Sequence, residues 1–194
     1  MYCTVQSDIT SKNTSINSKK LPAIYNRLDW DALREHWAKI TDFERFERTP
    51  VVLDFGCGRY TDHIEHFLAT KGFFYKGYDP FWKNSKENDE ALACKPYIVI
   101  CSNVLNVISN KETVNELQNF VRDFSFPALL GQNIVKEPSF YFITVYEGDK
   151  SGISRMTKPD CFQRNETLDN YIFRYEDVIY KNTITTENGK MFLK

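Results

Sequence analysis

The sequence predicts an α/β fold, a doubly wound and mostly parallel sheet that ends in an antiparallel hairpin. Three observations predict it. Buried-strand patterns alternate with helical patterns along the chain, and one strand runs into a Gly-x-Gly turn at residues 56–58. An Asn-Gly pair at 188–189 separates the last two apolar runs, which is a strong hairpin signal. Strands that alternate with helices are typical of parallel sheets, because a parallel connection needs a crossover.

The length of 194 residues, with 42% hydrophobic and 26% charged residues, predicts one domain. We place this domain at residues 23–194, after a polar arm at residues 1–22 whose composition cannot bury a core. The five scattered cysteines predict reduced thiols. Because no leader pattern and no bilayer-length apolar stretch is present, we expect a cytoplasmic protein without a membrane partner.

The first expected element is a helix or helix pair over residues 24–43, where apolar side chains recur at helical spacing. Val51–Leu53 is a short apolar run, typical of a buried strand, and it leads into the turn. A helix follows and stops at Lys71-Gly72. Phe73–Tyr78 predicts the second strand, so that residues 51–78 form a βαβ unit.

The next stretch, residues 81–96, is polar and shows no strand pattern, so the sheet is expected to lack one regular strand there. Residues 97–101 predict another buried strand, and residues 111–124 predict a helix with an apolar stripe and a capping signal. Residues 140–146 predict the longest strand.

Two elements are expected near the end of the chain. Residues 167–173 suit a short helix. Val178–Ile184 and Lys190–Leu193 predict the two strands of the closing hairpin, on either side of the Asn-Gly turn.

The Gly-x-Gly turn predicts a nucleoside-binding site. Because Gly56 and Gly58 have no side chains, a ligand can lie against bare backbone and the amides of the following helix. Asp79 follows 21 residues after Gly58, at the end of the next strand, where a carboxylate can accept hydrogen bonds from both ribose hydroxyls. The alternative interpretation is a purely structural strand-to-helix turn.

Two residues argue against a dinucleotide ligand. The dinucleotide fingerprint has a third small residue where this chain has Tyr60. Asp54 would repel a pyrophosphate, but it can pair with the ammonium of an amino-acid moiety. S-adenosyl-L-methionine has that ammonium, a ribose and no phosphate.

Three segments resemble class I S-adenosylmethionine-dependent methyltransferases: residues 52–58 their first motif, residues 77–80 their second, and residues 100–108 the segment after their fourth strand. The chain is more narrowly similar to the methyltransferases associated with DNA phosphorothioation. That similarity is carried by Lys19-Lys20-Leu21-Pro22, by the Asp-x-Gly-Cys-Gly-Arg turn that ends at Arg59, by Val-Leu-Asn-Val-Ile at 104–108 and by Phe162-Gln163.

The resemblance, which covers residues 19–171, implies a Rossmann-like class I methyltransferase fold, S-adenosyl-L-methionine as cofactor and a role in DNA modification. It implies that Asp54 holds the methionine end, Gly56 and Gly58 the sulfonium region, and Asp79 the ribose. The residues expected to contact the cofactor are Lys20, Tyr25, Asp54, Phe55, Gly56, Cys57, Gly58, Asp79, Pro80, Ser102 and Asn103. No catalytic residue is named, because methyl transfer needs mainly proximity and in-line orientation.

Several residues allow two interpretations. Ser102 and Asn103 line the site or cap a helix. Their segment lacks the Pro-Pro-aromatic signature of enzymes that methylate exocyclic amines of DNA, which disfavours that reaction. Phe81 and Trp82 either stack on a ligand ring or pack in the core.

Charged residues are equally ambiguous. His63 and His66 are three residues apart, but with no third ligand at a fixed spacing we expect a solvated helix face and no metal. Two basic stretches either clamp a phosphate-bearing substrate or form solvated loops, and the second alternative is preferred. They comprise Lys12, Lys19, Lys20 and Arg27, and Lys150, Arg155, Lys158 and Arg164.

The preferred interpretation is an S-adenosylmethionine-dependent methyltransferase whose acceptor is a nucleic acid or a small molecule. The net charge of −1 gives no general attraction for nucleic acid, so a nucleic-acid partner would have to be bound by a local basic patch. Two other hypotheses stay open: a non-catalytic S-adenosylmethionine-binding regulatory or interaction protein, and a nucleoside-cofactor hydrolase or lyase on the same fold. The sequence does not indicate an oligomeric state.

Overall fold

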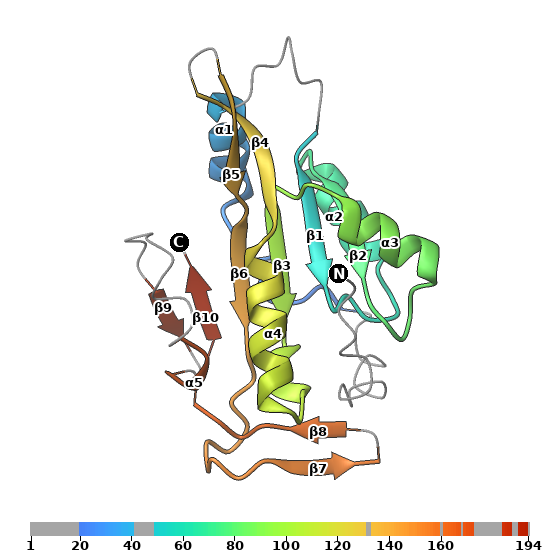
Figure 1. Cartoon of the computed structure of the whole chain (residues 1–194), viewed down its shortest axis with the longest axis vertical. Helices are drawn as coiled ribbons and strands as arrows, with labels where there is room; N and C mark the ends of the chain where they lie inside the picture. Colours follow the sequence, from blue (N-terminus) through green and yellow to red (C-terminus); the bar gives the residue numbers. More distant parts are fainter. Residues whose placement is uncertain are drawn as a thin grey trace.

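The computed structural model describes residues 20–40, 49–130, 133–159, 161–167, 169–172, 184–187 and 190–193. Its centre is a four-stranded parallel sheet in the order β2-β1-β3-β6 (Figure 1). These strands are β1 (Val51–Phe55), β2 (Phe74–Tyr78), β3 (Ile98–Ser102) and β6 (Phe140–Thr144). The expected mixed α/β architecture with a parallel sheet is confirmed.

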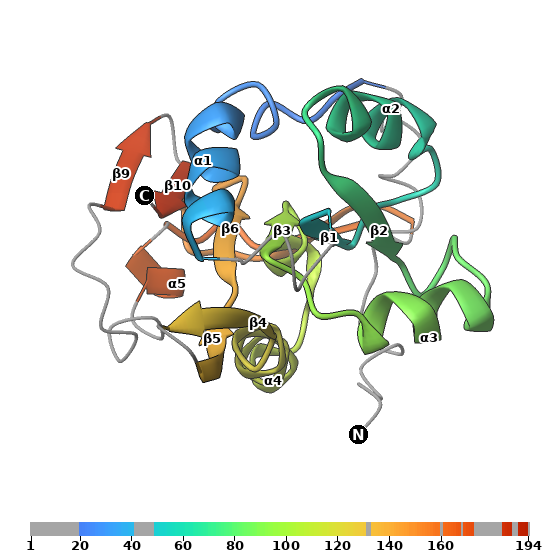
Figure 2. The same ribbon diagram turned by 90° about the horizontal axis from the view of Figure 1, so that it is seen from above.

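Helices cover both faces of this sheet (Figure 2). On one face lie α1 (Trp30–Ile40) and α2 (Asp62–Thr70), and on the other lie α3 (Ser85–Ala93) and α4 (Lys111–Arg122). Since successive side chains of a strand point to opposite faces, Val52 of β1 packs on the α1–α2 side and Leu53 packs on the α3–α4 side. Both faces are therefore buried, which explains the continuous apolar runs of the strands.

The helix or helix pair expected over residues 24–43 begins later than predicted. Residues 22–28 form turns, in which the Tyr25 N–H donates to the Pro22 carbonyl at 3.0 Å. The helix α1 begins at Trp30, because the Asp29 carboxylate accepts the Ala32 N–H at 3.0 Å and caps its first turn. Phe43, the last residue of the expected pattern, lies outside the described residues.

Residues 81–96 contain no strand, as expected, and form α3 instead. Asn84 and Glu87 make a capping box: the Asn84 side chain accepts the Glu87 N–H at 2.9 Å, and the Glu87 carboxylate accepts the Asn84 N–H at 3.0 Å. Ala91 is the one fully buried side chain of this helix. The helix was not predicted because its apolar pattern is weak. The Asn-x-x-Glu spacing, which is typical of a capping box, indicated its start.

Two antiparallel hairpins were not predicted. One pairs β4 (Ser125–Leu130) with β5 (Asn133–Pro138), and the other pairs β7 (Arg155–Lys158) with β8 (Cys161–Gln163). Figure 1 shows the second hairpin below the carboxyl ends of β3 and β6. The short helix η3 (Leu105–Val107) follows β3.

The closing hairpin is present as β9 (Ile184–Glu187) and β10 (Lys190–Leu193), which pair antiparallel. In the described part of the chain these strands bond to each other and form their own sheet, with β10 beside β6. Residues 178–183 of the expected first strand and the Asn188-Gly189 turn lie outside the described residues. The short helix expected at 167–173 is α5 (Asp169–Ile172). No helix among the described residues has the length and apolar character needed to cross a lipid bilayer.

Candidate functional site

The glycine turn lies at the carboxyl edge of the parallel sheet, directly after β1. Gly56 and Gly58 have φ values of 80° and 74°, a region that favours glycine. The N–H groups of Gly56 and Cys57 both donate to the Tyr78 carbonyl at the end of β2, at 2.8 and 3.1 Å. A Cβ on Gly56 would overlap the Val104 side chain. Backbone conformation and packing therefore both require glycine at this position.

The Asp79 carboxylate joins the turn after β1 to the turn after β2. One oxygen, Oδ2, accepts the Gly58 N–H at 2.9 Å, and Oδ1 accepts the N–H groups of Phe81 and Trp82 at 2.9 and 3.2 Å. Burial raises the pKa of Asp79, and these hydrogen bonds oppose that increase. A carboxylate has about four acceptor positions, so roughly one position on Oδ2 is left for a ligand.

The turn also lies at a change of direction in the sheet. The chain leaves β1 through α2 to reach β2 on one side, whereas it leaves β3 through α4 to reach β6 on the other side. In open α/β sheets, ligands bind outside the carboxyl ends of the strands at such a switch point. The glycine turn and Ser102-Asn103 are the segments that flank it.

Ser102 and Asn103 occupy the β3 side of this switch point. The Ser102 hydroxyl is 2.8 Å from the Thr144 hydroxyl, and the Asn103 N–H donates to the Thr144 carbonyl at 2.7 Å. Asn103 is exposed and has a φ of 57°. The capping interpretation is wrong, because α4 is capped by Asn110, whose side chain accepts the Glu112 N–H at 2.8 Å.

A buried polar cluster lies beneath the turn, on the α1–α2 side of the sheet. Asp54 is 4% exposed, and burial raises the pKa of its carboxyl to about 7. The Tyr25 hydroxyl opposes this increase, and the negative charge of Asp79 adds to it. The hydroxyls of Tyr25 and Tyr75 are themselves buried and lack a hydrogen-bond partner among the described residues. We call Tyr25, Asp54 and Tyr75 the Asp54 cluster.

The Tyr25 hydroxyl acts on the Asp54 carboxyl, but neither tyrosine hydroxyl makes a hydrogen bond of normal geometry with a described residue, so the hydrogen-bonding capacity of this cluster is only partly used. A buried carboxylate and buried hydroxyls are costly without partners, since water no longer solvates them. An ammonium group would supply positive charge and three donors at this place. Lys20, Tyr25 and Asp54 were all expected to contact the cofactor. The structure brings Tyr25 and Asp54 into contact, whereas Lys20 is exposed.

The other residues expected to contact the cofactor lie on different faces of the parallel sheet. Cys57 lies with the Asp54 cluster, where burial raises the pKa of its thiol. Phe55 points to the opposite face and stacks on Tyr78, with a ring-centroid distance of 4.5 Å. Its side chain therefore builds the core beneath the turn. Pro80 is partly buried between Asp79 and the following turn.

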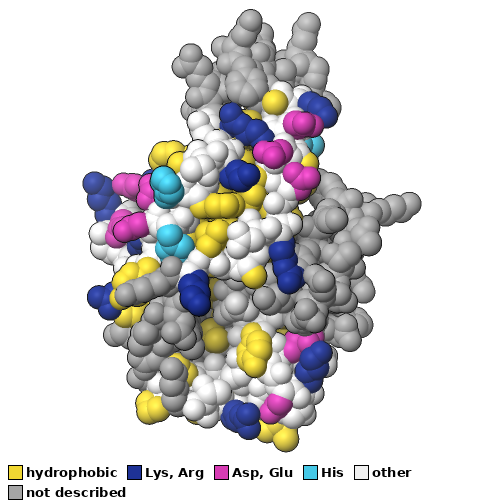
Figure 3. All heavy atoms as spheres, turned by 180° about the vertical axis from the view of Figure 1, so that it is seen from behind, with side chains coloured by type: hydrophobic (Ala, Val, Ile, Leu, Met, Phe, Trp, Pro, Cys, Tyr) yellow, Lys and Arg dark blue, Asp and Glu magenta, His cyan; other side chains and the backbone are white. Residues whose placement is uncertain are grey.

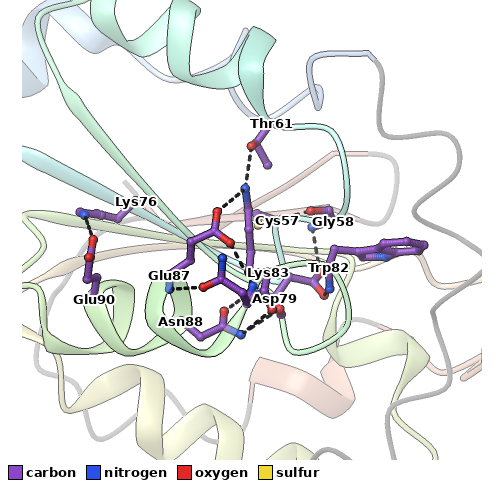
Figure 4. A network of polar contacts seen from close by, with 11 residues as sticks. Cys57, Gly58, Thr61, Lys76, Asp79, Trp82, Lys83, Glu87, Asn88 and Glu90 are labelled. Carbon is purple, nitrogen blue, oxygen red and sulfur yellow. Dashed lines mark hydrogen bonds and ion pairs between the residues drawn. The ribbon is translucent and has the colours of Figure 1, made fainter.

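Two cations lie beside the turn, of which Arg59 was named from the sequence only as part of the turn motif, without a role, and Lys83 was not singled out. The Lys83 ammonium donates to the Thr61 hydroxyl at 3.1 Å and lies 3.7 Å from the Glu87 carboxylate (Figure 4). The Arg59 guanidinium lies between two aromatic rings, 5.3 Å from the centroid of Tyr60 and 5.1 Å from that of Trp82. Neither residue is part of a periodic pattern, so spacing gave no signal for them.

The second basic stretch does not form a phosphate clamp as a whole. Arg164 is 5% exposed, donates to two backbone carbonyls at 2.7 and 2.8 Å and pairs with Glu166 at 2.8 Å. The clamp interpretation is therefore wrong for Arg164, because its guanidinium is buried and already satisfied. Lys150 and Arg155 are exposed and paired with acids at 2.7 and 3.3 Å. On the side of the molecule drawn in Figure 3, acidic and basic side chains are interspersed over the described surface.

The two histidines of α2 differ in exposure, with His63 partly buried and His66 exposed. Within the described ranges, no three His, Cys, Asp or Glu side chains come together in a way that could hold a metal ion.

No protein-family model matches the chain, and neither does any curated protein or solved structure. A function for the chain therefore has to be inferred from the glycine turn, the Asp54 cluster and the cations beside them.

Proposed function

We propose that the chain is an S-adenosyl-L-methionine-dependent methyltransferase domain of the Rossmann-like class I type, with the cofactor bound across the glycine turn. The observation that carries the proposal is the turn itself. Two glycines with positive φ leave β1 at the switch point of the sheet, and the Gly58 N–H is bonded to Asp79 at 2.9 Å. Bare backbone and a carboxylate are thus placed together at the edge where such sheets bind ligands.

The nucleoside end of the cofactor would lie at Asp79. Three backbone amides fix the orientation of this carboxylate and leave about one acceptor position on Oδ2. A ribose hydroxyl could donate to this oxygen without any reorientation of the Asp79 carboxylate, which lowers the entropic cost of binding.

The amino-acid end would lie at the Asp54 cluster. Its buried carboxylate, and buried hydroxyls without a hydrogen bond of normal geometry to a described residue, suit an ammonium and disfavour a pyrophosphate. This preference distinguishes S-adenosyl-L-methionine from a dinucleotide, in agreement with the bulky Tyr60 after the turn.

When bound, S-adenosyl-L-methionine supplies a methyl group whose carbon bonds to the acceptor nucleophile while the sulfonium takes the electron pair of the breaking bond. The residues of the chain position the reactants and exclude water. Ser102 and Asn103 follow β3, across the switch point from the glycine turn, and would face the acceptor in this arrangement. The acceptor, whether nucleic acid or small molecule, would need only in-line orientation.

Calorimetric titration with S-adenosylhomocysteine and with NADH tests the proposal, followed by a labelled-methyl screen over DNA, RNA and small molecules. We expect the first ligand to bind and the second to fail. Gly58→Ala should lower S-adenosylhomocysteine affinity at least tenfold, which corresponds to about 1.4 kcal/mol. The matched control is Gly152→Ala, because Gly152 has a similar φ of 73° and open space around its Cβ position. NADH binding in place of S-adenosylhomocysteine would contradict the proposal, and so would full affinity in Gly58→Ala.

A further inference from the structure

Asp79 has backbone groups that face away from the parallel sheet. It follows β2, which is the outermost strand on that side of the sheet in the part of the chain that the structure describes. The carbonyl of Tyr78 points to the inner side, where it accepts the N–H groups of Gly56 and Cys57. Successive residues of a strand present their backbone groups to alternate edges. The N–H and C=O groups of Asp79 therefore point to the outer side, where a further strand could satisfy them.

The side chain of Asn88, in α3, satisfies both of these groups (Figure 4). Its Oδ1 accepts the Asp79 N–H at 3.0 Å, and its Nδ2 donates to the Asp79 carbonyl at 3.1 Å. The same Nδ2 donates to the Lys83 carbonyl at 3.3 Å, and the Lys83 N–H donates to the Asp79 carbonyl at 3.1 Å. A side-chain amide carries both an acceptor and donors, so Asn88 bonds Asp79 as the backbone of a neighbouring strand would.

Asn88 is an unfavourable residue for α3 itself. Asn has a lower helix propensity than Ala or Glu, because its side chain competes for backbone hydrogen bonds. It lies inside the helix, one turn after the N-cap residue Asn84, whose side chain accepts the Glu87 N–H at 2.9 Å. Asn88 is partly buried, whereas its neighbours Glu87 and Asp89 are exposed. The two asparagines therefore have different roles: Asn84 begins the helix, and Asn88 connects the helix to the end of β2.

We propose that Asn88 is a positioning residue that fixes the Asp79 carboxylate for a ribose, in place of a further strand beyond β2. The ribose rests on the proposed function, whereas the positioning of Asp79 does not. Asn88 fixes the backbone of Asp79, and the N–H groups of Gly58, Phe81 and Trp82 fix its side chain. A carboxylate that is held at both ends offers its remaining acceptor position in one orientation, which lowers the cost of binding.

The proposal is tested by titrating wild type and Asn88→Ala with S-adenosylhomocysteine and with its analogue that lacks both ribose hydroxyls. Without the Asn88 bonds the carboxylate can reorient, so we expect the affinity for S-adenosylhomocysteine to fall about five- to tenfold. The analogue cannot donate to Asp79, so it should bind wild type and Asn88→Ala equally. A purely structural role of Asn88 would change the two affinities by the same factor, and that result overturns the proposal.

A double-mutant cycle tests whether Asn88 acts through Asp79. In the Asp79→Asn background the carboxylate that Asn88 orients is gone, so adding Asn88→Ala should change the affinity for S-adenosylhomocysteine by less than about twofold. If the effects of the two substitutions are additive, Asn88 acts independently of Asp79 and the proposal is overturned.

Asn84→Ala is the matched control, because it removes an asparagine side chain from the same helix that bonds within α3 and not to Asp79. It should leave both affinities unchanged.

Amide hydrogen exchange gives a measurement that needs no ligand. The Asp79 carboxylate accepts the N–H groups of Phe81 and Trp82, so these amides should exchange about tenfold faster in Asn88→Ala than in wild type or Asn84→Ala. Unchanged exchange overturns the positioning of Asp79. If wild type binds no S-adenosylhomocysteine, the proposed function fails and the ribose with it. The positioning of Asp79 is then decided by exchange alone, and faster exchange confined to Asn88→Ala supports it.

Discussion

Asp54 and Asp79 are buried carboxylates at the ends of neighbouring strands, but their surroundings differ. Three backbone N–H groups donate to Asp79, whereas no backbone N–H among the described residues donates to the Asp54 carboxylate. Burial raises the pKa of both groups, and among the described residues backbone amides oppose the increase only at Asp79. We infer that Asp79 holds the architecture of the site together and that Asp54 is kept available for a ligand, since buried charge without partners is costly to retain.

Loss of the Asp79 carboxylate should have the largest effect of the changes considered. Asp79→Ala leaves the N–H groups of Gly58, Phe81 and Trp82 without their acceptor, and hydrogen bonds to charged groups contribute about 1.5 to 3 kcal/mol each. Because these bonds act together, we expect the free energy of unfolding to fall by about 3 to 5 kcal/mol in urea denaturation.

The conservative change at the same position sharpens this expectation. Asp79→Asn keeps one acceptor oxygen and should lose about half as much stability. If both variants unfold at the wild-type urea concentration, Asp79 does not connect the two turns, and the contrast with Asp54 disappears.

The same change at Asp54 should act in the opposite direction. Asp54→Asn removes a buried charge that no backbone amide of the described residues stabilises, so the free energy of unfolding at pH 8 should rise by about 2 kcal/mol. Affinity for S-adenosylhomocysteine should fall in the same protein, because the ammonium loses its counter-charge. A destabilised Asp54→Asn variant would show that the carboxylate serves the fold, as Asp79 does.

The ionisation of Asp54 predicts a pH dependence of stability. With a pKa near 7 in the folded state and an ordinary value of 3.8, the folded protein binds the proton more tightly than the unfolded chain does. Stability from this group is therefore lost as the pH rises through 7, by about 1.4 kcal/mol between pH 6 and pH 8. The free energy of unfolding should show this decrease in wild type. His36, whose pKa is lowered by burial, also contributes to the pH dependence of stability. Subtracting the pH dependence of Asp54→Asn from that of wild type removes this contribution and leaves the contribution of Asp54.

The glycine turn and Asp79 could be predicted from the sequence because the 21-residue spacing reflects one local βαβ unit. Proximity of Tyr25 to Asp54 was implied only by the family resemblance, since the turn at 22–28 reaches the sheet through packing. Occupation of the Asp79 carboxylate by backbone amides could not be predicted, because it depends on how two turns fold back on each other. The helix α3 was not predicted for a different reason. Few of its side chains are buried, so it lacks an apolar stripe, and its capping box was the one sequence signal.

Tyr25→Phe should have the smallest effect on stability and a clear effect on the ligand. The hydroxyl is buried near the Asp54 carboxyl but makes no hydrogen bond of normal geometry with a described residue, so its removal should change the free energy of unfolding by less than about 1 kcal/mol. Because the same hydroxyl lowers the pKa of Asp54, its loss should move the pH-dependent decrease in stability to higher pH. We expect S-adenosylhomocysteine affinity to fall about two- to tenfold, the range for one neutral hydrogen bond.

Tyr171→Phe is the matched control, because the Tyr171 hydroxyl is also buried without a hydrogen-bond partner among the described residues but belongs to α5. Equal ligand affinity in the two variants would show that the Tyr25 hydroxyl only packs against Asp54. Weaker affinity confined to Tyr25→Phe would show that the turn at residues 22–28 is part of the ligand site.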